Sequence, residues 1–120
     1  MQNENFVPSR HYERIKPAID IIHNGFLQSE PSIADLAAAC GMGESYFQRL
    51  FKEKYGMPPK KYMIQLKVNH ACELLRMERY NVSQVAEMSG FSDVYFFSRQ
   101  FKGYMGITPT EFIKKYVSSK

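Results

Sequence analysis

The feature that most constrains the fold of this chain is an internal repeat. Residues 41–59, GMGESYFQRLFKEKYGMPP, and residues 90–109, GFSDVYFFSRQFKGYMGITP, both run from a glycine through an aromatic and basic segment to a second glycine and a proline. The parts upstream of the first glycine match at an offset of 49 positions, and the downstream parts match at 50. One residue is therefore inserted where the second basic segment begins. Spaced matches of this kind indicate a duplicated supersecondary unit.

Each copy of the repeat predicts two short helices joined by a tight turn. The patterns Ser-x-x-Asp at 32–35 and Asn-x-x-Gln at 81–84 have the spacing of a capping box, which marks the start of a helix. Apolar residues then recur at helical spacing as far as Gly41, which can adopt the left-handed conformation of a turn. A second helix is expected over residues 44–54. This arrangement is a helix-turn-helix.

The remaining segments also predict helices. Apolar residues at helical spacing indicate a helix from about residue 9 to 26, with Pro17 marking a start or a kink nearby. Residues 59–77 predict a longer helix of about 19 residues, roughly 28 Å at 1.5 Å per residue. A final short helix is expected over residues 109–116. The predicted fold is all-α, with about seven helices in two homeodomain-like helix-turn-helix subdomains joined by a long connecting helix.

These elements divide the chain into four parts. We expect an arm or linker remnant at residues 1–8, a first helix-turn-helix subdomain at 9–57, the connecting helix at 58–78 and a second subdomain at 79–120. The formal net charge is +4, and its distribution follows the repeat: residues 1–40 hold three Lys or Arg against five Asp or Glu, whereas 41–120 hold thirteen against seven. A polyanion-binding surface would need this excess where the repeat lies.

Several other protein classes are disfavoured. Cys40 and Cys72 are too few and too far apart for a disulfide scaffold or a zinc site, so two buried free thiols are expected. No apolar run approaches the roughly 20 residues of a membrane span, and the N-terminus lacks the core of a signal peptide. We therefore expect a cytoplasmic protein with no membrane partner. The three histidines are scattered and no phosphate-binding glycine loop is present, so no catalytic residue, metal or cofactor is predicted.

The second helix of each repeat carries a polar face suited to a major groove. Helical spacing separates this face from buried aromatic residues such as Phe47 and Phe97. Arginine can bond guanine bidentately, glutamine can do the same to adenine, and valine can contact the thymine methyl group. The predicted base-reading residues are Ser45, Gln48 and Arg49 in the first helix and Val94, Tyr95, Ser98 and Arg99 in the second.

A second set of residues is predicted to contact phosphates. Lysines further along the two helices position the protein without reading sequence, and helix starts offer free N–H groups to anions. The predicted phosphate contacts are Lys52, Lys102, Ser32, Asn81 and Thr108. For the last three, a pure capping role explains the residues equally well. Three further alternatives stay open: solvated polar faces, an aromatic platform for single strands, and a module for protein docking.

The segment GFSDVYFFSRQFKGYMGITPTEFIKKY resembles the C-terminal signature of the AraC/XylS family of bacterial transcription regulators. The first repeat, SYFQRLFKEKYG, is similar to the other recognition helix of that family. The resemblance covers about residues 12–116. It implies a double helix-turn-helix domain that addresses two successive major grooves of double-stranded DNA, and it places the seven base-reading residues above at the family's base-reading positions. Three residues depart from the family pattern, namely Gly43, Pro58 and Tyr95.

The resemblance also implies a biological context. Most members activate transcription by contacting RNA polymerase near a promoter, and some repress, so we expect an activator. Members usually carry a separate N-terminal domain that senses a small-molecule effector or dimerises, and nothing in this chain resembles one. We expect the DNA-binding portion of a longer, effector-responsive regulator, with a small stand-alone member as the alternative.

Overall fold

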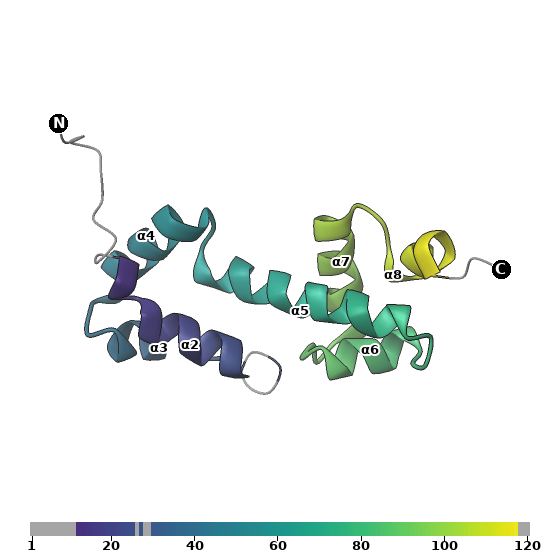
Figure 1. The fold of residues 1–120 in the computed structure, drawn as a ribbon, viewed down its shortest axis with the longest axis horizontal. Coiled ribbons are helices and arrows are strands. Elements are labelled where there is room, and N and C mark those ends of the chain that lie inside the picture. Colours follow the sequence, from purple (N-terminus) through teal and green to yellow (C-terminus); the bar gives the residue numbers. More distant parts are fainter. Residues whose placement is uncertain (1–11, 26, 28–29, 118–120) are drawn as a thin grey trace. The chain divides into compact units, whose positions relative to one another are not determined.

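The computed structural model describes residues 12–25, 27 and 30–117, and the account below concerns these residues alone. Over this part of the chain it contains seven α-helices and one π-helical turn, with no β-strand (Figure 1). The predicted all-α class is confirmed. The predicted arm at residues 1–8 lies outside the described residues.

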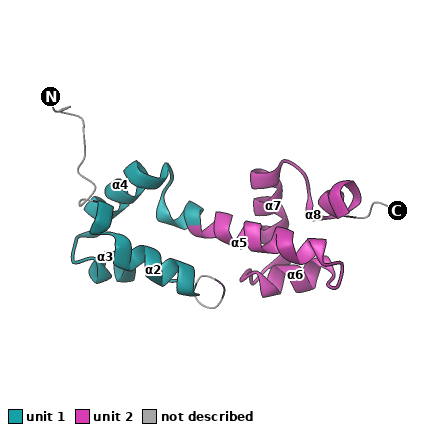
Figure 2. Cartoon of the chain, in the orientation of Figure 1, with its two compact units in different colours: residues 1–25, 30–62 teal, residues 26–29, 63–120 magenta. Residues whose placement is uncertain are grey.

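The chain divides into two compact units, drawn in different colours in Figure 2. The first holds α2 (Lys16–Gly25), α3 (Ile33–Ala39) and α4 (Glu44–Tyr55), and the second holds α6 (Val82–Met88), α7 (Val94–Met105), α8 (Pro109–Phe112) and the π-helical turn η1 (Ile113–Val117). The connecting helix α5 (Pro59–Arg76) begins in the first unit and continues in the second from residue 63 onward. The four-part division predicted from the sequence stays a prediction.

The first unit is built around residues that face inward from all three of its short helices. Phe47 and Phe51 of α4 are fully buried, and their ring centroids lie 5.9 Å apart. Phe51 also packs edge-on against Tyr62 of α5, at 5.3 Å. The other buried residues of these helices are Ala18, Ile22, Leu36, Ala37 and Leu50. Aromatic and aliphatic side chains at helical spacing therefore place the polar face of α4 outward.

The second unit repeats this plan with its own core. Phe97 and Phe101 of α7 are fully buried, with ring centroids 5.7 Å apart, and Phe101 meets Phe112 of α8 edge-on at 5.6 Å. The rest of this core comes mainly from α5 and α6: Ile64, Val68, Ala71, Cys72, Leu74, Leu75, Val85, Ala86 and Phe91. Burial of such side chains supplies most of the favourable free energy of folding.

One expected element is corrected by the structure. Residues 12 and 13 are helical, residues 14 and 15 form a turn, and α2 begins at Lys16, so the helix predicted from about residue 9 to 26 is interrupted. Pro17 is the physical reason, because it has no backbone N–H to continue a helix that would run through residue 13. The predicted start near Pro17 is therefore correct, and the part of the predicted helix before residue 12 lies outside the described residues.

The turns of the two helix-turn-helix units are closely similar. Gly41 and Gly90 have φ values of +68° and +87°, a conformation that a side chain with a Cβ rarely adopts. The N–H of Met42 bonds the carbonyl of Ala37 at 3.1 Å, and the N–H of Phe91 bonds that of Ala86 at 2.9 Å. Each of these hydrogen bonds closes a turn of six residues at the end of a helix, as in a Schellman motif.

The turns also show where the extra residue lies. Met42 and Phe91 make equivalent hydrogen bonds at an offset of 49, whereas the N-cap residues that precede α4 and α7, Gly43 and Asp93, are 50 apart. Ser92 is therefore the inserted residue, immediately before the N-cap of α7. It lengthens the second turn by one residue while leaving the preceding hydrogen bond unchanged.

Two of the predicted caps are complete capping boxes. Asn81 Oδ1 accepts from the N–H of Gln84 at 2.8 Å, and Gln84 Oε1 accepts from the N–H of Asn81 at 2.9 Å. Thr108 and Glu111 form the same reciprocal pair at the start of α8. At the start of α3, Ser32 Oγ accepts from the N–H of Asp35 at 3.0 Å. The helix starts that the sequence pattern predicts are confirmed at all three places.

Replacing Asn81 with alanine is expected to lower the free energy of unfolding by about 1 kcal/mol, because the backbone N–H of Gln84 at the start of α6 loses its acceptor, Asn81 Oδ1. Urea unfolding followed by circular dichroism measures the change. Ser83→Ala is the matched control, since Ser83 is an exposed residue of the same helix. Equal effects of the two substitutions would mean that the box adds nothing to stability.

The two cysteines are both free thiols, but their burial differs. Cys72 is buried as predicted, whereas Cys40 is only half-buried, which corrects the expectation of two buried thiols. Partial removal from water still raises the pKa of the Cys40 thiol, and burial raises that of Cys72 as well. At neutral pH both groups are therefore protonated and weakly reactive.

None of the described helices has the length and apolar character needed to cross a membrane.

Candidate nucleic-acid interface

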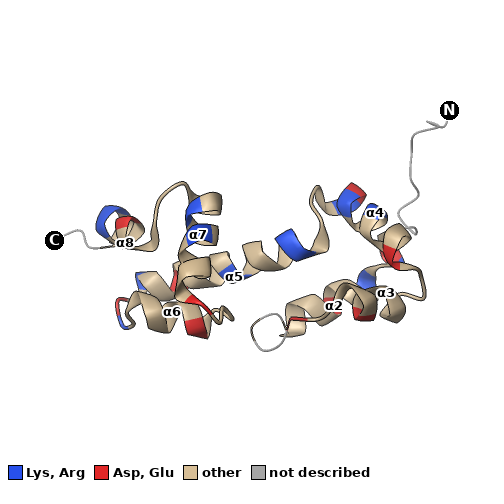
Figure 3. Cartoon of the chain, turned by 180° about the vertical axis from the view of Figure 1, so that it is seen from behind, with Lys and Arg blue, Asp and Glu red and all other residues tan. Residues whose placement is uncertain are grey.

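The candidate interface is the outward face of α4 and, in the other unit, the outward face of α7. Each helix has 12 residues and ends at a glycine in the left-handed conformation, Gly56 or Gly106. Each also follows directly from a tight turn, so the first residues of the helix are held at a defined place. Figure 3 shows Lys and Arg on both helices.

The predicted residues of α4 lie together on its exposed side. Ser45, Gln48, Arg49 and Lys52 are all exposed, while Phe47, Leu50 and Phe51 on the other side are buried. No side-chain hydrogen bond caps the start of this helix, because Gly43 occupies that position. Glu44 is the one acidic residue of its first turn.

The predicted residues of α7 are less uniform in exposure. Tyr95 is the most exposed large apolar side chain of the described residues, at 74%, and Arg99 and Lys102 are also exposed. Ser98 and Val94 are half-buried, and Val94 packs against the core of its unit. Only part of the Val94 side chain therefore remains available to a partner.

The start of α7 differs from that of α4 in its cap. Asp93 Oδ1 accepts from the N–H of Tyr95 at 2.8 Å, so a carboxylate sits where α4 has a glycine. A negative charge at a helix start interacts favourably with the helix dipole. An aspartate immediately before an aromatic and basic helix is the sequence signal that would have identified this cap.

Two arginines on these helices contact aromatic rings in the same way. The guanidinium carbon of Arg49 lies 5.2 Å from the ring centroid of Tyr46, and that of Arg99 lies 5.8 Å from the centroid of Phe96. Both distances fall within the range of cation–π attraction. Neither contact was predicted from the sequence, in which Phe96 was considered only as part of an aromatic stacking platform.

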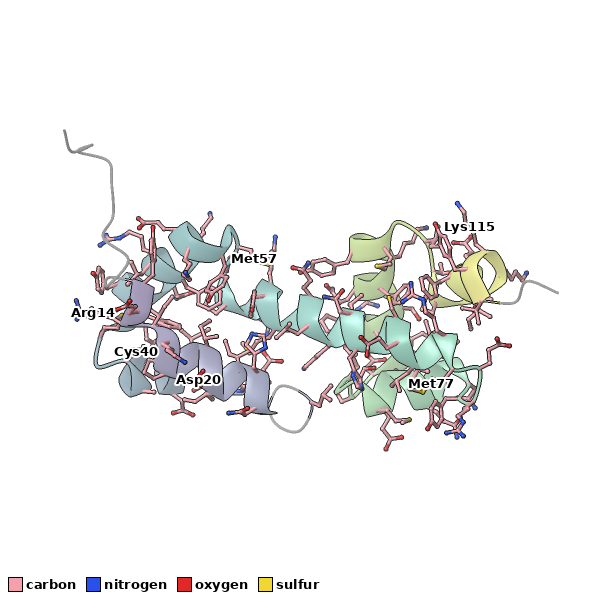
Figure 4. All side chains as sticks on the ribbon, in the orientation of Figure 1. Arg14, Asp20, Cys40, Met57, Met77 and Lys115 are labelled. Carbon is pink, nitrogen blue, oxygen red and sulfur yellow. The ribbon has the colours of Figure 1, made fainter. Side chains whose placement is uncertain are left out.

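Two further residues at this interface were also missed. Glu44 is the first residue of α4, as Val94 is of α7, so the offset of 50 would have identified it as the counterpart of a predicted base contact. Carboxylates can accept a hydrogen bond from cytosine. Arg14, labelled in Figure 4, lies 6.0 Å from the ring of Tyr46 and adds a second guanidinium beside α4. No repeat signal points to Arg14, because it precedes the duplicated segment.

The three predicted phosphate contacts at helix starts are engaged as caps. Ser32 and Thr108 accept through their hydroxyl oxygens, and Asn81 accepts through its amide oxygen. Each keeps polar hydrogens that it can still donate, two on the Asn81 amide and one on each hydroxyl. The hydrogen bond from the Thr108 N–H lowers the pKa of the Glu111 carboxyl, so this partner is ionised at neutral pH.

Among the described residues, no group of three or more His, Cys, Asp or Glu side chains is arranged to hold a metal ion.

Comparison with known protein families matches residues 36–115 to a helix-turn-helix domain. A curated relative, the HTH-type transcriptional activator RhaR of Yersinia pseudotuberculosis, is 30% identical over 104 residues, which cover 84% of this chain and 36% of the relative. The chain spans about a third of the length of the curated relatives it matches.

Two solved structures have the same fold. A transcriptional regulator from Chromobacterium violaceum, described as an AraC-type DNA-binding domain-containing protein, superposes with a TM-score of 0.77 at 26% identity, covering 94% of this chain and 100% of that one. The DNA-binding domain of the global transcriptional factor AdpA, solved in complex with a target DNA, superposes with a TM-score of 0.73 at 25% identity, covering 83% and 92%.

Proposed function

Because the chain belongs to the AraC family of helix-turn-helix transcription regulators, we propose that it binds double-stranded DNA at specific sequences. In this proposal α4 and α7 are recognition helices that enter successive major grooves. The observation that carries it is that an exposed arginine and an exposed lysine recur at equivalent positions, Arg49 and Lys52 on α4 and Arg99 and Lys102 on α7. The two helices have the same length and both end at a left-handed glycine. The solved complex of AdpA with DNA supports the same use of the fold.

The base-reading role falls to residues on the outward face near the start of each helix, of which Val94 and Ser98 are half-buried. In the first unit these are Ser45, Gln48 and Arg49, and in the second Val94, Tyr95, Ser98 and Arg99. Arg49 and Arg99 would each select guanine, and Gln48 would select adenine. The Tyr95 side chain is 74% exposed, and its ring would cover apolar groups of the DNA such as a thymine methyl.

The positioning role falls to residues that meet the DNA backbone. Lys52 and Lys102 lie one turn beyond the arginines and would contact phosphates on either side of the groove. Ser32, Asn81 and Thr108 would donate their remaining polar hydrogens to phosphate oxygens while they cap their helices. Such contacts fix the register of the protein on the duplex but carry no sequence information.

The wider role follows from the relatives. We propose that the chain is the DNA-binding part of an activator that contacts RNA polymerase and acts on chromosomal DNA in the cytoplasm. The name of the Yersinia relative supports activation. An effector would act through a separate domain of the regulator. In this role the chain binds DNA and catalyses no reaction.

Lys102→Ala is expected to weaken binding to all duplexes by a similar factor. It should also lower the magnitude of the slope of log affinity against log salt by about 1, because roughly one counterion fewer is released. Fluorescence anisotropy with labelled duplexes at several salt concentrations measures both quantities. Lys16→Ala is the control, since Lys16 is exposed on α2 and already paired with Asp20 at 3.3 Å. Binding that does not depend on salt in the wild-type chain would favour a protein-docking module instead.

A further inference from the structure

The arginine–aromatic contact occurs once in each unit, at equivalent positions. Tyr46 and Phe96 are 50 residues apart, as are Arg49 and Arg99, and the two contact distances are 5.2 and 5.8 Å. In each case the ring precedes the arginine by three residues, so both side chains lie on the same side of the helix. The two units have separate cores, and each one makes this contact by itself.

Each ring is half-buried. Phe96 packs against the core of its unit and lies 6.0 Å from the ring of Phe91. Tyr46 is half-buried and has Arg14 at 6.0 Å as well as Arg49. A half-buried position by itself would accept an aliphatic residue. A fixed ring, however, offers a guanidinium a flat surface on which to rest.

The contact leaves the hydrogen-bonding groups of both arginines available. Within the described part of the chain, neither Arg49 nor Arg99 forms an ion pair. A ring engages the face of the guanidinium, whereas guanine is bound through N–H groups in its plane. An acidic partner would compete for those N–H groups, and an aromatic one does not.

We propose that Tyr46 and Phe96 are positioning residues that hold the guanidinium groups of Arg49 and Arg99 ready to bind guanine. Each ring reduces the conformational freedom that its arginine would lose on binding, and such pre-organisation increases affinity. This inference rests on the proposed function, because it assumes that both arginines read bases.

The first test needs no DNA. In the free chain, the ring current of Tyr46 should shift the Nε–H resonance of Arg49 upfield, and that of Phe96 should do the same for Arg99. Nitrogen-15 NMR of the arginine side chains measures both shifts. Tyr46→Phe and Phe96→Tyr, which keep a ring, should preserve them, whereas Tyr46→Leu and Phe96→Leu should abolish them. Shifts that persist in the leucine variants would overturn the inference.

The second test uses duplexes that the wild-type chain selects from a random pool. Tyr46→Leu is expected to weaken binding to the selected duplex about two- to fivefold, the range of an exposed cation–π contact, and Tyr46→Phe should restore it. The loss should disappear when the guanine read by Arg49 is replaced by 7-deazaguanine, which lacks the N7 acceptor. The same comparison applies to Phe96→Leu and Arg99.

A double-mutant cycle separates positioning from a general effect on the fold. Tyr46→Leu should have no further effect on binding in an Arg49→Ala background, but its full effect in a Lys52→Ala background, because Lys52 does not contact the ring. Equal effects in both backgrounds would overturn the positioning role while leaving DNA binding intact. A wild-type chain that selects no duplex would instead refute the proposed function, and the NMR result would then describe a contact without that role.

Discussion

Replacing Phe97 with alanine is expected to lower the free energy of unfolding by about 3–5 kcal/mol, the range for removing a large buried aromatic side chain. Phe97 is fully buried in α7 and packs against Phe91 at 5.1 Å and Phe101 at 5.7 Å. The substitution removes a whole ring from the centre of the second unit, and neighbouring rings cannot collapse far enough to fill the space. A loss of this size is a large part of the stability of a typical domain.

Chemical denaturation gives the size of this loss, and amide hydrogen exchange gives its location. Protection is expected to fall first in α6 and α7. Tyr95→Ala is the matched control, because Tyr95 lies two residues away on the same helix but is 74% exposed, and such a surface substitution should change stability by no more than about 0.5 kcal/mol. A loss below about 1 kcal/mol for Phe97→Ala would contradict the packing described for this core.

Arg49→Ala and Arg99→Ala are each expected to weaken binding to a selected duplex by about 1–3 kcal/mol and to relax the preference for guanine at one position. Each substitution removes a bidentate donor and leaves the guanine acceptors without partners. The two arginines lie in separate units, so their effects should be close to additive. The double variant should therefore retain little more than salt-dependent, non-specific binding.

Binding of each variant to a panel of duplexes that differ at single base pairs measures these effects. Arg76→Ala is the control, because Arg76 also rests on a ring, that of Phe112 at 5.3 Å, but belongs to α5 and not to a recognition helix. It should leave base preference unchanged. An unaltered site preference after removal of both Arg49 and Arg99 would show that the base-reading assignment is wrong.

Most of the helix boundaries of this fold can be predicted from the sequence because its local signals agree with one another. The capping pattern at Asn81, the turn glycine at Gly90 and the buried aromatics of α7 each indicate the same boundaries. The helix predicted from about residue 9 is interrupted before α2 because Pro17 has no N–H to bond the carbonyl of residue 13. Pro17 is also the sequence signal that predicted a start or kink at this place.

The candidate interface was predicted less completely than the fold. Helical spacing separates an exposed face from a buried one, and it correctly placed Gln48 and Arg49 outside and Phe47 inside. It says little about half-buried residues at the border between the faces, where Tyr46 and Phe96 lie. Their contacts with the arginines depend on side-chain conformations and on neighbours such as Arg14, which no periodic pattern reveals.

The most direct test of the central claim is selection of bound duplexes from a random pool by the 120-residue chain, followed by sequencing and salt titration of the selected duplexes. Recognition by α4 and α7 together predicts two short motifs about one helical turn apart, roughly 34 Å along the duplex, both required for tight binding by one chain. Selection of a single motif would contradict the use of two recognition helices. No enrichment at any salt concentration would contradict sequence-specific DNA binding itself.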